Sequence, residues 1–270
     1  MTICQVFIFS LILAITNFFP VSSHGHLQIA QILSSFDPND LICFVQFSSF
    51  GILAALLIYF NEDIKALFKF KTAAAKKRNF KLLTNIAITC IVGVIVGLIS
   101  AIIVEKNSLF NDIFATAIAM GVTGLVMVAA DNFIKKPKLK NETKLTKKQA
   151  TIIGTSQLFS PIPGISYPAT TIVAGRLVGL DNRSSAKYSF ITMIPTLFGV
   201  LVGFLIYCNG FSYILDNLSI LLISNSITLF IGVLIIMLSI KIFSKQKSLE
   251  WFGYYRIVVC LIILIVALLV

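Results

Sequence analysis

Charged residues are scarce in this sequence. Asp, Glu, Lys and Arg make up 12% of its 270 residues, against about 25% in a typical soluble domain. The hydrophobic fraction is 57% and the mean hydropathy is +0.95. No polar stretch is long enough to fold as a separate soluble domain, so we predict a single membrane domain over residues 1–270.

Acidic residues are scarcer still, with 11 Asp and Glu against 22 Lys and Arg, for a net charge of +11. The basic residues gather in short loops beside apolar runs and form no stripe interleaved with aromatics, as a nucleic-acid site would. We therefore predict a membrane partner and no nucleic acid. The cysteines show no CxxC pair and no neighbouring histidine, so we interpret them as packing residues. They are Cys4, Cys43, Cys90, Cys208 and Cys260.

Long apolar runs are abundant, and a membrane-spanning helix needs about 20 predominantly apolar residues. Three basic loops, at residues 65–81, 135–148 and 241–247, separate such runs and should remain in the cytoplasm. The first 64 residues contain no Lys or Arg, and the loop at 209–217 carries only Asp216 as a charge. The segment just before the first span and the C-terminus should therefore face outward. The predicted spans are residues 41–60, 82–104, 110–130, 188–208, 218–240 and 251–270.

Two shorter apolar stretches end at prolines. Residues 2–19 could be a signal peptide, but the basic region that such a peptide needs is missing. A seventh span there would leave the basic loops on one side, so charge alone leaves that alternative open. The second stretch covers residues 150–160, and a helix-like segment at 169–180 follows it. We favour re-entrant hairpins because both stretches stop in the same way.

The first break, residues 17–26, contains Pro20, and the second break, residues 160–171, contains Pro161 and Pro163. Proline removes a backbone donor and ends a helix, and each break continues into a hydroxyl-rich loop. Three spans separate the breaks, so the hairpins would enter from opposite faces, as in inverted repeats. We predict an all-α polytopic membrane protein with six transmembrane helices and two re-entrant helical hairpins. Repeat one covers about residues 1–131 and repeat two about 149–270, with a basic cytoplasmic loop at 132–148 between them.

Both histidines of the chain, His24 and His26, lie in the first break beside Ser22 and Ser23. Helix N-termini that meet at such breaks bind anions. An imidazole there can deprotonate a hydroxyl or donate to a phosphate oxygen. The alternative is that these side chains only satisfy backbone groups where the helices stop.

Residues 18–27, Phe-Phe-Pro-Val-Ser-Ser-His-Gly-His-Leu, resemble the first signature of the undecaprenyl-diphosphatase family, also called bacitracin-resistance proteins. Residues 152–157, 162–166 and 169–171 resemble its second signature. The likeness spans nearly the whole chain. Further similar segments lie at residues 59–60, 124–130 and 190–195.

This resemblance implies a hydrolase of the bacterial inner membrane that converts polyprenyl pyrophosphate to polyprenyl phosphate and recycles the carrier lipid of cell-wall peptidoglycan synthesis. It also implies Mg²⁺ or another divalent cation as cofactor, and leaves a homo-oligomer open. Ser23 would be the catalytic nucleophile, and His26 its base or the general acid. The implied substrate-binding residues are Asn17, Ser22, Gly25, Gly164, Ser166, Tyr167 and Thr171.

The chain departs from the family pattern at charged positions. Leu13 and Asn17 stand where the family has Glu or Gln and then Glu, and Lys187 replaces a further Glu. Tyr167 and Pro168 stand where it has Arg and Ser. Carboxylates are the ligands that Mg²⁺ prefers, and Asn17 could ligate a cation only weakly through its carbonyl oxygen. Arginine offers phosphate a planar fork that tyrosine cannot reproduce.

These departures leave a second hypothesis open, a catalytically inactive relative that binds or translocates polyprenyl phosphate. A small-solute transporter with an inverted repeat is a third hypothesis. It is the weakest of the three, because no further polar residues form an obvious stripe along the spans.

Overall fold

The computed structural model describes residues 2–34, 38–106, 112–134, 137, 139, 141–245 and 247–269. Across these residues the chain is helical and contains no strand, only an isolated bridge between Leu139 and Leu180. The all-α fold class is therefore confirmed. The helices are α1 (Ile3–Thr16), α2 (Ser23–Ser34), α3 (Pro38–Tyr59), α4 (Asn61–Leu67), α5 (Ala73–Lys106), α6 (Ile113–Phe133), η2 (Glu142–Lys144), α7 (Lys147–Ser156), η3 (Gln157–Phe159), α8 (Tyr167–Leu177), α9 (Asn182–Tyr207), α10 (Gly210–Phe243) and α11 (Ser248–Leu269).

Six of the described helices are long and apolar enough to cross a membrane, as predicted. The expected outer loop at 209–217 is wrong, because α10 already begins at Gly210 and only Asn217 leaves helical geometry, with φ −122°. The helices α1, α2, α7 and α8 have 10 to 14 residues each, fewer than the about 20 that a span needs. We retain their re-entrant arrangement as a prediction. The six candidate spans are α3, α5, α6, α9, α10 and α11.

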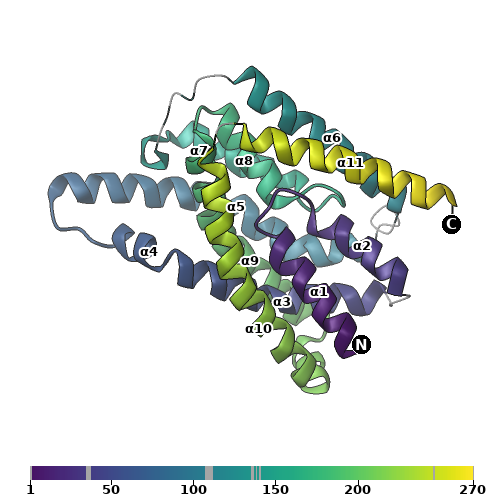
Figure 1. The fold of residues 1–270 in the computed structure, drawn as a ribbon. Coiled ribbons are helices and arrows are strands. Elements are labelled where there is room, and N and C mark those ends of the chain that lie inside the picture. Colours follow the sequence, from purple (N-terminus) through teal and green to yellow (C-terminus); the bar gives the residue numbers. More distant parts are fainter. Residues whose placement is uncertain are drawn as a thin grey trace.

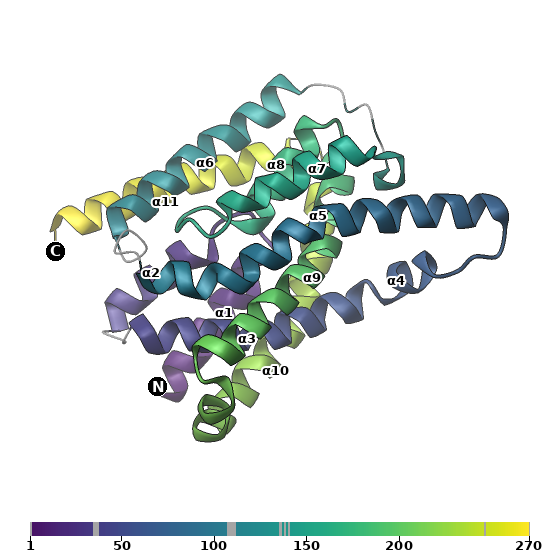
Figure 2. The same cartoon turned by 180° about the vertical axis from the view of Figure 1, so that it is seen from behind.

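The long helices pack in pairs that combine the two halves of the chain. Helix α6 lies along α11 (Figures 1 and 2), α5 packs against α9, and α3 packs against α10. Each pair takes one helix from each predicted repeat. The last spans of the two halves, α6 and α11, pack on each other, whereas the other two pairs join α5 to α9 and α3 to α10. The short helices α1, α2, α7 and α8 are held among these pairs, which brings both breaks into the interior. The inverted symmetry of the repeats stays a prediction.

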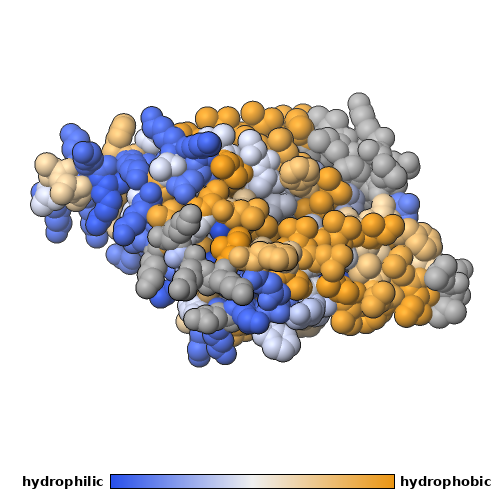
Figure 3. All heavy atoms as spheres, turned by 90° about the horizontal axis from the view of Figure 1, so that it is seen from above, coloured by the Kyte–Doolittle hydropathy of each residue, from blue (hydrophilic) through white to orange (hydrophobic). Residues whose placement is uncertain are grey.

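Hydrophilic residues gather at one end of the molecule, and apolar residues cover much of the remainder (Figure 3). We call this the basic end, since it carries α4, the lysine-rich start of α5 and the segment before α7. There, Lys187 Nζ at the start of α9 lies 2.6 Å from Asp63 Oδ1 and 3.3 Å from Glu142 Oε1. These ion pairs join α4, η2 and α9 at the basic end and place Lys187 in a structural contact.

Buried hydroxyls join α1, α3 and α10 inside the bundle. Ser224 Oγ lies 2.9 Å from Ser10 Oγ and 2.7 Å from Ser48 Oγ. Gly51 N donates to Asn225 Oδ1 at 2.6 Å, and a Cβ at Gly51 would collide with the Thr228 side chain. Small residues let helix backbones approach closely in a membrane, and hydroxyl contacts then hold them. These contacts hold α1 against α3 and α10, and they therefore position the start of the first break.

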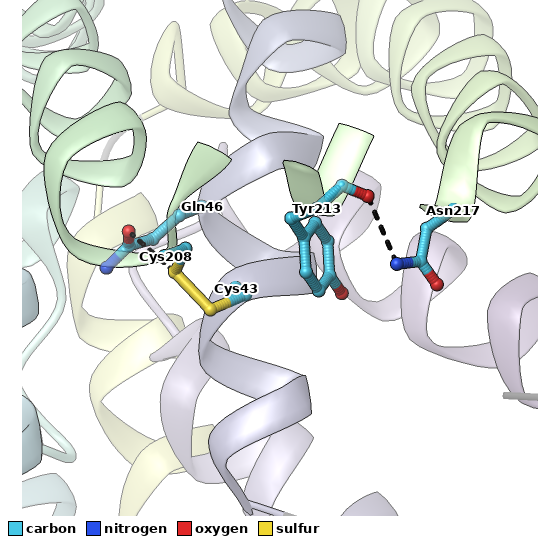
Figure 4. The surroundings of a disulfide bond; sticks show 5 residues. All are labelled: Cys43, Gln46, Cys208, Tyr213 and Asn217. Carbon is cyan, nitrogen blue, oxygen red and sulfur yellow. Dashed lines mark hydrogen bonds between the residues drawn. A yellow bond between two sulfur atoms is a disulfide. The ribbon is translucent and has the colours of Figure 1, made fainter. Parts of the chain in front are cut away.

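A disulfide joins Cys43 near the start of α3 to Cys208 just after α9, across 165 residues of sequence and 5.8 Å between the Cα atoms (Figure 4). The interpretation of all cysteines as packing residues is therefore wrong for these two. Cys90 and Cys260 are free and buried, whereas Cys4 is free and exposed. Disulfides persist in oxidising compartments. The bond lies at the end opposite the basic end, so it agrees with the outward orientation that the lysine loops predict.

Replacing Cys43 and Cys208 together by serine is expected to lower the free energy of unfolding by about 2–4 kcal/mol, because the bond closes a long loop in the unfolded chain. Thermal unfolding in detergent, with and without reductant, measures this effect. Cys4→Ser is the matched control and should unfold like the wild type. Equal unfolding temperatures for the wild type and the double variant would show that the bond adds no stability.

Candidate anion site between the two breaks

The first break turns the chain from α1 into α2. Ser22 has φ 72°, and its Oγ accepts a hydrogen bond from Gly25 N at 3.3 Å, which caps the start of α2. A Cβ on Gly25 would meet the sulfur of Met120, so glycine lets α2 lie close to α6 without a shift of that side chain. Ser239 Oγ donates to the Phe18 carbonyl at 2.8 Å and ties the break to α10. The start of α2 is thus fixed on three sides.

The second break repeats this design. Ser166 Oγ accepts a hydrogen bond from Ala169 N at 3.5 Å and caps α8, with Pro168 in the first turn of the helix. Gly164 has φ +84°, and a Cβ there would meet the Thr116 backbone of α6. Both helices that leave the breaks therefore begin with a serine cap, and both breaks pack against α6.

A buried arginine of α11 connects the two breaks from behind. Arg256 is 0% exposed, and its Nη1 donates to the Pro20 carbonyl at 3.0 Å. Its Nη2 donates to the Gly164 carbonyl and to Thr123 Oγ1, and its Nε to the Met120 carbonyl at 3.3 Å. One guanidinium therefore holds a carbonyl from each break. A charged residue inside a membrane span signals function by itself, and that signal was available in the sequence.

A cavity of about 290 Å³ opens between the breaks, walled by α1, α2, α3, α5, α9 and the start of α8. More than half of its lining residues are apolar, among them Leu13, Ile52 and Met193. The others are uncharged hydroxyls and amides plus one imidazole, and no Asp, Glu, Lys or Arg is among them. The polar lining residues are Asn17, Ser23, His24, Gln28, Gln31, Gln46, Ser49, Ser160, Ser166, Tyr167 and Thr196.

Four of the predicted site residues line this cavity, namely Asn17 and Ser23 from the first break and Ser166 and Tyr167 from the second. Asn17 donates from Nδ2 to the Leu13 carbonyl at 2.8 Å, and Tyr167 donates from its hydroxyl to Thr192 Oγ1 at 3.2 Å. Burial raises the pKa of Tyr167, which therefore stays a neutral donor. The structure thus brings residues from both breaks to one cavity, as the sequence predicts.

The other predicted residues shape the breaks from outside the cavity lining. Ser22, Gly25 and Gly164 set the turns described above. Thr171 is buried, and its Oγ1 lies 2.8 Å from the Tyr167 carbonyl and 2.5 Å from Ser189 Oγ.

His26 lies on the far side of α2 from the cavity. Its Nδ1 lies 2.8 Å from the Ser22 carbonyl oxygen and its Nε2 2.7 Å from the Tyr255 hydroxyl, with the two rings stacked. Burial lowers the pKa of His26 and favours the neutral ring. The imidazole that lines the cavity is that of His24. The catalytic role of His26 stays a prediction. His24, which the sequence analysis placed in the first break without assigning it a catalytic role, lines the cavity, as do the amides Gln28 and Gln46, which that analysis did not single out.

Arg176 is the buried basic residue of α8, and it does not line the cavity. It lies near the basic end, where its Nε lies 3.5 Å from Asp131 Oδ1 and its Nη atoms donate to the carbonyls of Leu180 and Ile134. Asp131 in turn accepts from the backbone at the start of α11. Arg176 therefore has a structural role, like Lys187.

The fold and the cavity together define a polytopic helical membrane protein with a cavity between two broken helices, which is the candidate anion site. The bacitracin resistance protein BacA family matches residues 6–262, so the chain belongs to that family. It is 33% identical to an undecaprenyl-diphosphatase of Thermoanaerobacter sp. (strain X514), over 97% of this chain and 96% of that protein. An undecaprenyl-diphosphatase of Aquifex aeolicus (strain VF5) is 29% identical, with 97% of each chain covered. One of Fusobacterium nucleatum is 28% identical, over 97% of this chain and 99% of that protein.

Proposed function

We propose that this chain hydrolyses a polyprenyl pyrophosphate to polyprenyl phosphate and inorganic phosphate in the bacterial inner membrane, as a step of carrier-lipid recycling for the cell wall. The observation that carries the proposal is the convergence of two serine-capped helix N-termini on one cavity that also holds Ser23 and His24. Helix N-termini stabilise phosphate, and the apolar part of the lining suits a prenyl chain. The relatives named undecaprenyl-diphosphatase support this substrate class.

Ser23 is the candidate nucleophile. Its Oγ would attack the terminal phosphorus, the bond to the polyprenyl phosphate oxygen would break, and the serine proton would pass to a base. Water would then cleave the phosphoserine and release phosphate. His24 is the imidazole on the cavity wall and is suited to move these protons, whereas His26 would position α2 through Tyr255.

Phosphate release from polyprenyl pyrophosphate by the purified chain tests the proposal. Ser23→Ala and His24→Ala are each expected to lower kcat by about 10²-fold or more, as removal of a nucleophile or a general acid–base group does. His26→Ala should cause a smaller loss together with a lower unfolding temperature. A larger loss for His26→Ala at unchanged stability would instead support His26 as the base, and release no higher than from blank membranes would contradict catalysis.

The second candidate function is a non-catalytic relative that binds or translocates polyprenyl phosphate. It is favoured by the uncharged lining of the cavity, because Leu13, Asn17 and Tyr167 offer neither a carboxylate nor a guanidinium. Tight binding of polyprenyl phosphate without any phosphate release from the pyrophosphate would support this function over catalysis.

A further inference from the structure

The residues that line the cavity do not suit a divalent cation. Mg²⁺ takes oxygen ligands and prefers carboxylates, yet no Asp or Glu lines the cavity. Leu13 is 1% exposed and apolar, and Asn17 offers only an uncharged amide oxygen, because its Nδ2 donates to the Leu13 carbonyl. Among the described residues there is no group of three or more His, Cys, Asp or Glu side chains that could hold a metal ion. An anionic headgroup would therefore meet the protein's own donors.

Positive potential is nevertheless present on the protein side of the cavity. Helices α2 and α8 both begin at the cavity wall, and each N-terminus carries a partial positive charge. Behind them, Arg256 makes hydrogen bonds only to carbonyl and hydroxyl oxygens, and no carboxylate of the described part of the chain forms an ion pair with it. A buried charge without a counter-ion is costly, and a bound anion nearby would reduce that cost.

We propose that the cavity binds a polyprenyl phosphate ester without a divalent cation, with the two helix N-termini and Arg256 supplying the positive potential that a metal and an arginine at position 167 would otherwise supply. The inference rests on the proposed function, since it concerns the same site. Arg256 acts as a positioning residue, because its contacts are to the carbonyls of the breaks. Its charge also adds positive electrostatic potential at the cavity. Ser23 adds a neutral hydroxyl on the cavity wall, whereas the hydroxyls of Tyr167 and Thr196 already donate to Thr192.

Binding in the presence and absence of metal tests the inference. Farnesyl pyrophosphate or a longer polyprenyl pyrophosphate is titrated into the purified chain in EDTA and in Mg²⁺. The Kd is expected to differ less than about tenfold between the two conditions. A loss of binding greater than this in EDTA would overturn the metal-free site while the proposed function stands. No binding under either condition would overturn the proposed function, and the inference with it.

A second measurement uses Mn²⁺ alone as the probe, without lipid. Calorimetry should find Mn²⁺ bound no more tightly by the wild type than by the neutral control Leu13→Gln with Asn17→Gln. The variant Leu13→Glu with Asn17→Glu places two carboxylates one helical turn apart on the cavity wall and should bind Mn²⁺ at least about tenfold more tightly than the control. Tight binding of Mn²⁺ by the wild type that the neutral control lacks would contradict the inference.

Discussion

Arg256→Met is expected to abolish phosphate release and to lower the free energy of unfolding by about 3 kcal/mol or more, because the buried carbonyls of Pro20, Gly164 and Met120 lose their donor. Arg256 is 0% exposed, so these carbonyls do not face bulk solvent that could supply other donors. Both breaks should loosen together, and with them the starts of α2 and α8. Thermal unfolding in detergent and the phosphate-release assay measure the two effects.

Two further variants separate charge from shape at this position. Arg256→Lys keeps the positive charge but lacks the planar fork with its five donors, so it should retain binding of the lipid phosphate while kcat falls. Arg183→Met removes an exposed arginine at the start of α9, and should change stability by less than about 0.5 kcal/mol. Wild-type stability and activity in Arg256→Met would refute the role of this residue as the link between the breaks.

The six spans were predictable because each is a continuous apolar run long enough to cross a membrane. The breaks were predictable because proline is followed there by a hydroxyl-rich loop, whereas Pro195 stands inside α9 without ending it. The pairing of Cys43 with Cys208 was not, since 165 residues separate them and only the packing of α3 beside α9 brings them together. The loop expected before residue 218 failed for a local reason. The polar residues at 216 and 217 suggested an end, but the helix continues through a single distorted residue.

The choice between the two histidines shows where sequence reasoning about the site stops. His24 and His26 are two residues apart, which is about 200° around an α-helix, so only one can face the cavity. Which one does so depends on the angle at which α2 leaves the break. That angle is set by Ser22 in its left-handed conformation and by the contact of Gly25 with Met120. The sequence motif predicts neither the conformation of Ser22 nor the contact with Met120, although it does place both imidazole rings near the break.

The triple variant Leu13→Glu, Asn17→Glu and Tyr167→Arg is expected to raise phosphate release by about 10²-fold or more in Mg²⁺, since one preorganised electrostatic contact is worth about 3 kcal/mol in the barrier. All three positions line the cavity. Leu13 and Asn17 are four residues apart and share a face of α1, while Tyr167 opens α8. The new carboxylates can share a cation, and the new guanidinium can meet the phosphate opposite them.

The same variant should lose its gain in EDTA, where two unneutralised carboxylates repel the pyrophosphate, whereas the wild type should be indifferent to the chelator. The matched control, Leu13→Gln, Asn17→Gln and Tyr167→Gln, keeps the polarity and adds no charge, so it should show neither the gain nor the metal dependence. A gain that survives EDTA would mean that the arginine alone limits the native chain. No gain in any condition would mean that the geometry of the breaks, rather than the missing charges, sets its activity.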